Sequence, residues 1–134
     1  MVKLVSIEGI GKVYADKLAE AGYGSLRAFY EAGATEKGRK DIVEKTGISS
    51  KLILEWVNHC DLFRIKGVGE EYADLLDETG VDSVPELAQR NPDNLFEKIL
   101  AVNAEKKLVR RLPVKKQVAD WIEQAKKLPR VVTY

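Results

Sequence analysis

An all-α fold, made of two tandem helical repeats that pack together, is predicted by three observations on this 134-residue sequence. Apolar residues recur at three- and four-residue spacing along most of the chain, as on one face of an amphipathic helix. Period-two alternation, the sign of a strand, is confined to the short run at 131–133. The stretch IEGIGKVYADKLAEAG at 7–22 is written again at 65–80 as IKGVGEEYADLLDETG, with nine of sixteen positions identical. We therefore divide the chain into a first repeat, 1–62, and a second, 63–134.

The first repeat is expected to contain several short helices, each marked by a start signal. Ser25, Thr35 and Ser49 are polar residues that can accept a hydrogen bond from the backbone of a following first turn. The apolar stripes of the predicted helices are Tyr14, Leu18 and Ala21; Leu26, Phe29 and Tyr30; and Leu52, Ile53, Trp56, Val57 and Leu62. The last of these helices leads directly into the second glycine-rich stretch, so it serves both repeats.

The second repeat follows the same order of elements. A helix carrying Tyr72 and Leu76 is expected first. Ser83-Val84-Pro85-Glu86 then combines a capping box with a proline in the first turn. Asn91-Pro92 starts a further helix, and a final helix lies between Pro113 and Pro129. The apolar stripe of that final helix is Val118, Trp121, Ile122, Ala125 and Leu128.

Both copies of the repeated stretch place Gly-apolar-Gly immediately before an amphipathic helix. Two glycines one residue apart allow a tight turn with positive φ, which leaves backbone N–H groups pointing outward at a helix N-terminus and suits a phosphate. The pattern resembles the helix-hairpin-helix family, and this resemblance implies SAM-like helical repeats that contact nucleic-acid phosphates without reading sequence. With RNPDNL, VNAEKKLVRRLP and VADWIEQAKKL downstream, most of the chain also resembles the bacterial family catalogued as domain of unknown function 4332. That second resemblance implies a fold and no activity.

The first hairpin is the better candidate for an anion site, because it combines backbone donors, a helix N-terminus and one cation. Its predicted contact residues are Gly9, Ile10, Gly11 and Lys12. Glu8 opposes an anion there, and the same turn has a purely structural use if Ile7 and Ile10 pack into a core.

The second hairpin, Gly67, Val68 and Gly69, is expected to be structural or to bind a protein. Glu70 and Glu71 follow it in the first turn of the next helix, where the helix dipole favours negative charge. These carboxylates occupy the position that a phosphate would take.

A basic run near the end of the chain supplies a second candidate nucleic-acid contact. Its residues are Lys106, Lys107, Arg110, Arg111, Lys115 and Lys116. Three- and four-residue spacing from 106 to 111 would place four bases on one side of a helix. Residues 98–134 hold ten bases and three acids, whereas residues 67–97 hold nine acids and one base. The alternative interpretation is therefore that the basic run faces the acidic helices, within the molecule or in an oligomer.

Catalysis finds little support in the sequence. We find no P-loop, Rossmann or nucleophile-elbow spacing. The one histidine, His59, and the one cysteine, Cys60, are neighbours whose side chains diverge by about 100° on a helix. A disulfide, a metal site and a cofactor are not expected, and neither is enzymatic activity.

The composition, 45% apolar and 32% charged, is that of a soluble globular protein, and no apolar run reaches membrane-spanning length. We expect a cytoplasmic, non-enzymatic binding module without membrane contact. Sequence-independent binding of DNA or RNA phosphates is the first hypothesis, and a protein-interaction adaptor is the alternative. The oligomeric state and binding of a monovalent cation at either hairpin stay open.

Overall fold

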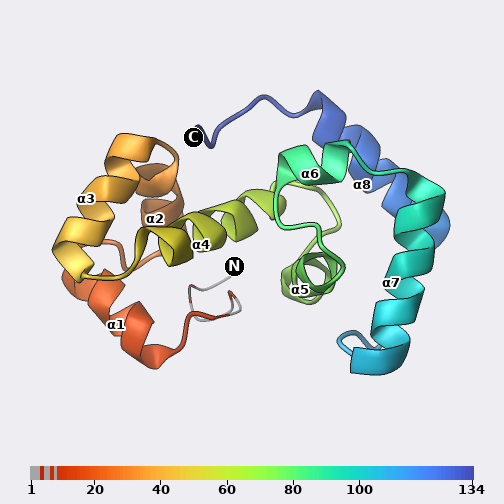
Figure 1. The fold of residues 1–134 in the computed structure, drawn as a ribbon, viewed down its shortest axis with the longest axis horizontal. Helices are drawn as coiled ribbons and strands as arrows, with labels where there is room; N and C mark the ends of the chain where they lie inside the picture. The colour runs from red at the N-terminus through yellow and green to blue at the C-terminus, as the bar shows by residue number, and fades with distance from the viewer. Residues whose placement is uncertain (1–3, 5–6, 8) are drawn as a thin grey trace. The chain divides into compact units, whose positions relative to one another are not determined.

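The computed structural model describes Leu4, Ile7 and residues 9–134, and these residues form helices and no strand. The prediction of an all-α fold is confirmed. The helices are α1 (Lys12–Glu20), α2 (Leu26–Gly33), α3 (Glu36–Thr46), α4 (Ser50–Leu62), α5 (Glu70–Glu78), α6 (Val84–Ala88), α7 (Pro92–Lys106) and α8 (Lys115–Lys127) (Figure 1).

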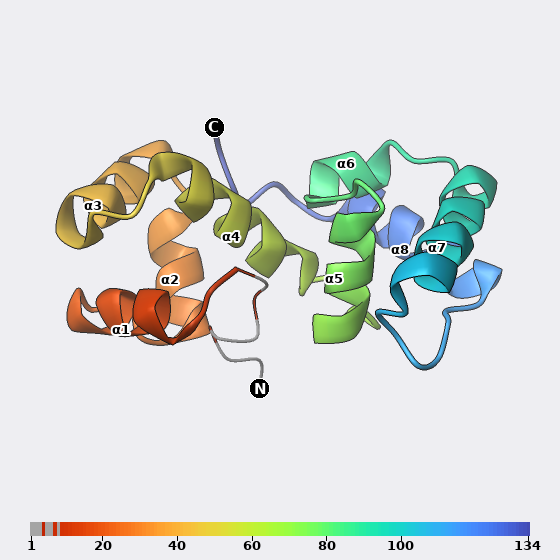
Figure 2. The same cartoon turned by 60° about the horizontal axis from the view of Figure 1, so that its bottom comes forward.

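The chain divides into two compact units. Unit 1 comprises Met1–Asp61 and Arg130–Tyr134, and unit 2 comprises Leu62–Pro129. Helices α1 to α4 belong to unit 1, apart from the last residue of α4, and α5 to α8 belong to unit 2 (Figure 2). The chain leaves unit 1 at the end of α4 and returns to it after α8.

Polar side chains cap five helices at the predicted positions. Each accepts a hydrogen bond from a backbone N–H of the first turn: Ser25 from Ala28 (3.0 Å), Thr35 from Gly38 (3.0 Å), Ser49 from Leu52 (3.3 Å), Ser83 from Glu86 (3.3 Å) and Asn91 from Asp93 and Asn94 (2.9 and 3.1 Å). A cap of this kind contributes about 1 kcal/mol because it satisfies a donor that has no partner within the helix.

Each unit has its own apolar core. In unit 1 the buried side chains include Ile7, Ile10, Leu18, Phe29, Ile42, Ile53, Trp56 and Val57. The core of unit 2 includes Leu62, Ile65, Val68, Leu75, Leu76, Leu87, Leu95, Ile99, Trp121 and Ile122. Within unit 2, α8 packs against both α6 and α7, and α5 packs against α7. Burial of Ile7 and Ile10 gives the first hairpin the structural role that the sequence left open beside anion binding.

The predicted helix through the basic run is wrong beyond its first residue. Helix α7 ends at Lys106, and Lys107 adopts a left-handed conformation with φ of 51° at the C-cap. The Asn103 side chain forms two hydrogen bonds with the backbone of Val109: it accepts from the N–H (3.0 Å) and donates to the carbonyl (3.3 Å). Residues 107–114 therefore form a loop, and the three- and four-residue spacing of their bases has no helical meaning.

Candidate nucleic-acid interface

The first hairpin is a tight turn that ends in an exposed helix N-terminus. Gly9 has φ of 92°, and the Ile10 N–H donates to the Ile7 carbonyl at 3.0 Å. Gly11 is the extended N-cap of α1, and no side chain caps that helix. Gly9, Gly11 and Lys12 are exposed, whereas Ile10 is buried. The four predicted residues are thus brought together in one turn, with Ile10 anchoring it.

Gly9 is required by both its conformation and its surroundings. A β-carbon at this position would lie 3.2 Å from Nε1 of Trp56, which is only 2% exposed. The Trp56 ring in turn packs against Tyr14 of α1, with ring centroids 5.1 Å apart. Trp56 therefore couples the turn to the first helix that follows it.

The second hairpin repeats this geometry within unit 2. Gly67 has φ of 96°, and the Val68 N–H donates to the Ile65 carbonyl at 3.1 Å. A β-carbon on Gly67 would lie 3.1 Å from Nε1 of Trp121, and Trp121 packs against Tyr72 with centroids 5.2 Å apart. The two glycine turns thus share a backbone conformation and an indole-tyrosine support.

The charge at the two helix N-termini is opposite in sign. The first turn of α1 contains no acid and begins with Lys12, whereas α5 begins with Glu70 and Glu71. Lys12 lies 3.8 Å from Asp16, but both side chains are strongly exposed, so this pair contributes little. An anion at α1 would meet the positive end of a helix dipole and one cation. At α5 it would meet two carboxylates.

Gln124 gives the second hairpin a further structural contact that the sequence analysis missed. From α8 its side chain accepts from the Lys66 N–H (2.8 Å) and donates to the Lys66 carbonyl (3.1 Å). Lys66 and Gln124 lie 58 positions apart in the sequence, so no local sequence pattern predicts this contact. Part of the backbone of this hairpin is therefore already engaged inside unit 2.

Two residues of the basic run form ion pairs inside unit 2. Lys106 contacts Glu78 of α5, and Lys115 contacts Asp93 of α7. Both acids lie in the acidic stretch, so internal pairing accounts for these two bases. Partial exposure of all four side chains keeps each pair weak.

The other four bases of the run are exposed: Lys107, Arg110, Arg111 and Lys116. None of them forms an ion pair with a described residue. Three of them lie in the loop after α7, which is held by two side chains. Asn103 bonds to the backbone of Val109, and the Tyr72 hydroxyl donates to the Arg111 carbonyl at 2.9 Å. The first hairpin belongs to unit 1 and this basic loop to unit 2, so they are two separate candidate contacts.

His59 and Cys60 lie in the interior of unit 1. Burial lowers the pKa of the His59 imidazole, and burial followed by the negative charge of Asp61 raises the pKa of the Cys60 thiol to about 12. At neutral pH the thiol is protonated, so it is not a nucleophile. Among the described residues no group of three or more His, Cys, Asp or Glu side chains is placed to hold a metal ion.

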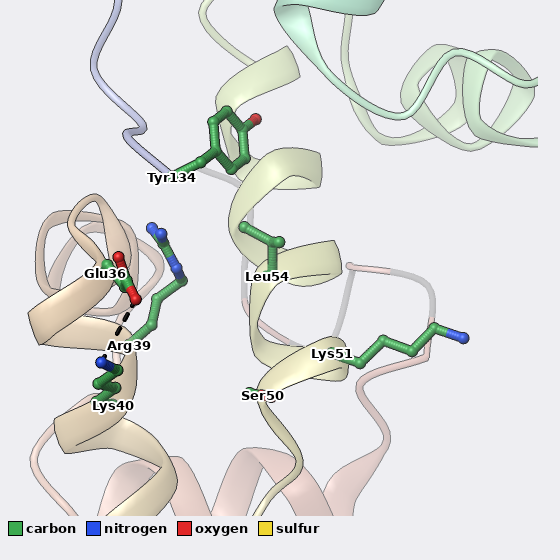
Figure 3. A pocket seen from close by; sticks show the side chains of 7 residues that line it. All are labelled: Glu36, Arg39, Lys40, Ser50, Lys51, Leu54 and Tyr134. Carbon is green, nitrogen blue, oxygen red and sulfur yellow. Dashed lines mark ion pairs between the residues drawn. The ribbon is translucent and has the colours of Figure 1, made fainter.

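A pocket of about 390 Å³ lies between α3 and α4 of unit 1, and sequence analysis did not predict it (Figure 3). Leu54 and Tyr134 contribute apolar and aromatic surface to its wall, and Arg39 extends toward Tyr134. Lys40 is paired with Glu36 at 3.4 Å, and Lys51 points away from the pocket. Among the bases that line the pocket, the buried Arg39 is therefore the one whose guanidinium lies along the wall without an acidic partner.

No helix in the described part of the chain combines the length and apolar character needed to cross a membrane.

Comparison with known protein families identifies the family to which the chain belongs. The family model of the domain of unknown function (DUF4332) matches residues 8–128. The comparisons with curated proteins and with solved structures gave no match. Because the family match covers most of the sequence, the chain belongs to the DUF4332 family, as the motifs of its two halves predict.

Proposed function

We propose that this protein is a non-enzymatic binding module that contacts nucleic-acid phosphates, independently of sequence, through its first glycine hairpin. The observation that carries the proposal is the N-terminus of α1: it is exposed, it has no side-chain cap, and it follows a positive-φ turn beside Lys12. The first N–H groups of a helix have no intrahelical partner and bind anions well. Backbone donors and one lysine hold a phosphate but do not discriminate between bases.

The matching turns at Gly9 and Gly67 support the interpretation of the chain as two helix-hairpin-helix-like repeats. On this interpretation the copies have diverged in function. The first keeps an anion site, and the second, with Glu70 and Glu71 at its helix N-terminus, serves structure or protein contact.

The exposed bases of the loop after α7 and of the first turn of α8 are the proposed second contact with the phosphate backbone. Of the six bases in the predicted strip, Lys107, Arg110, Arg111 and Lys116 keep this role in the proposal, because they are free of the ion pairs that engage Lys106 and Lys115. Protein interaction is the second candidate function. It is favoured by Glu70 and Glu71, which are exposed and form no ion pair with a described residue.

Fluorescence anisotropy with a labelled duplex and a labelled single strand tests the proposal at about 50 and about 200 mM salt. Binding should weaken linearly on logarithmic axes, and Lys12→Ala should lower the slope by about one unit. Lys17→Ala, on the same helix but in its last turn, is the matched control and should leave the slope unchanged.

A parallel pair tests the basic loop. Arg110→Ala should lower the slope by about one unit, and Lys127→Ala, an exposed base of α8, should change it less. Absence of binding to both nucleic acids at the lower salt would refute the proposal and leave protein interaction as the function to test.

A further inference from the structure

Residues 130–134, here called the terminal segment, lie outside any helix and belong to unit 1. The Thr133 N–H donates to the Ala34 carbonyl at 2.8 Å, and the Thr133 hydroxyl reaches the same oxygen at 3.3 Å. The preceding side chain, Val132, is 3% exposed and so contributes an apolar anchor. Neighbouring Val131 is partly exposed, which identifies Val132 as the inward-facing aliphatic position.

Arg39 organises the other side of this contact. Its buried guanidinium donates to the Gly33 carbonyl at 2.7 Å and to the Thr133 carbonyl. The Tyr134 ring lies 5.9 Å from the same guanidinium, and its hydroxyl donates to Asn58 at 2.9 Å. Backbone hydrogen bonds together with pockets for particular side chains are the usual basis of extended-peptide recognition.

Space remains next to the docked segment. The pocket between α3 and α4 has Tyr134 as one wall and continues from it toward Ser50 at the start of α4 (Figure 3). Among the bases of its lining, Lys40 is paired with Glu36 and Lys51 points away, so Arg39, which is hydrogen-bonded to neutral carbonyls, supplies the positive charge of the wall. A peptide residue that followed the aromatic position would enter this pocket, and the charge of Arg39 favours an acidic side chain there.

We propose that this face of unit 1 is a binding site for an extended peptide of a partner protein with the sequence aliphatic-Thr-aromatic followed by acidic residues. The terminal segment is its resident occupant. A tethered segment competes at an effective concentration in the millimolar range. With an intrinsic dissociation constant of about 100 μM, a tether of about 1 mM leaves roughly one molecule in ten open. A partner therefore needs the additional contacts that the pocket offers.

The test uses the full chain, labelled with ¹⁵N, and amide shifts recorded by NMR during titration with synthetic peptides. The probe is LPRVVTYEE, which is the sequence from Leu128 onward with two added glutamates. The receptor is the Val132→Asp chain, because a buried carboxylate is costly and releases the resident segment. This chain should bind the probe about 10-fold more tightly than the unsubstituted chain, with shifts at Ala34, Arg39 and Asn58.

Two control peptides need no change in the protein. LPRVVPYEE lacks both the N–H and the hydroxyl that Thr133 gives to Ala34, so it should not bind. LPRVVTYKK should bind a few-fold more weakly than the probe. Should Val132→Asp disturb the spectrum beyond this face, Thr133→Pro in the full chain releases the segment by removing the N–H and the hydroxyl that bond to Ala34. Three results would overturn the site: equal affinity of the probe for the released and unsubstituted chains, binding of LPRVVPYEE, or the absence of a saturable shift. Equal affinity of LPRVVTYEE and LPRVVTYKK would overturn the acidic position.

Discussion

Alanine substitution of three glycines around the first hairpin should separate backbone strain from crowding. Gly11 has an ordinary φ and open space around its Cβ position, so strain should be absent there. Gly22 has φ of 97° and also has open space, whereas Gly9 combines φ of 92° with the indole of Trp56 at 3.2 Å. The three sites thus differ by one physical factor at a time.

The expected losses of unfolding free energy follow from these differences. Gly11→Ala should lie within about 0.5 kcal/mol of zero, since the gain from a less flexible unfolded chain offsets a poorer N-cap. Gly22→Ala should cost about 1–2 kcal/mol for a left-handed alanine. Gly9→Ala adds displacement of the Trp56 ring, for a total of about 2–4 kcal/mol.

Urea unfolding followed by tryptophan fluorescence and circular dichroism measures all three. The same order is expected for Gly69, Gly80 and Gly67 in unit 2, where the Cβ of Gly80 would meet only the flexible ends of Arg90 and Lys98. A loss at Gly9 no larger than that at Gly11 would refute the reasoning, because neither the positive φ nor the indole contact would then constrain the turn.

Three further predictions concern charge and protonation. Replacing Glu70 and Glu71 together by lysine should create or strengthen nucleic-acid binding at the second hairpin, as measured by fluorescence anisotropy. Glu97→Lys, at an exposed site in α7, serves as the control. Equal effects on binding would show that the position of the added charge does not matter. Burial lowers the folded-state pKa of His59, so the unfolded chain binds more protons than the folded chain as the pH falls. The contribution of His59 to stability is therefore complete above about pH 6.5 and decreases below it. The urea midpoint should be lower at about pH 5.5 than at about pH 7.5, and this difference should be smaller in His59→Gln. Cys60, with its pKa raised to about 12, should react with iodoacetamide far more slowly in folded than in unfolded protein at pH about 8, and similar rates would contradict its burial.

Local signals predicted the helix starts and the two turns. Ser25, Thr35, Ser83 and Asn91 each act on a donor two or three residues ahead, so the responsible chemistry lies within a short window of sequence. The paired glycines are similarly informative, because a positive φ restricts the residue type at that position.

Contacts between distant residues account for what the sequence did not predict. Spacing alone made the basic run resemble a helix, whereas the Asn103 clamp on Val109 and the left-handed Lys107 end α7 before it. Arg39 was not distinguishable from a solvent-exposed helix residue, because its carbonyl partner at Thr133 lies 94 positions away. The ion pairs that engage Lys106 and Lys115 likewise depend on how α5, α7 and α8 pack.

Return of the chain to unit 1 after α8 has a consequence for biosynthesis. Unit 2 is one uninterrupted stretch, Leu62–Pro129, and all of its residues have been translated before Arg130 is added. Unit 1 is discontinuous, since Thr133 bonds to Ala34 across 99 residues. Domains made on the ribosome generally fold from the N-terminal end first. Here every residue of unit 2 is made before unit 1 receives residues 130–134, so the docking of this segment is a late step in completing unit 1.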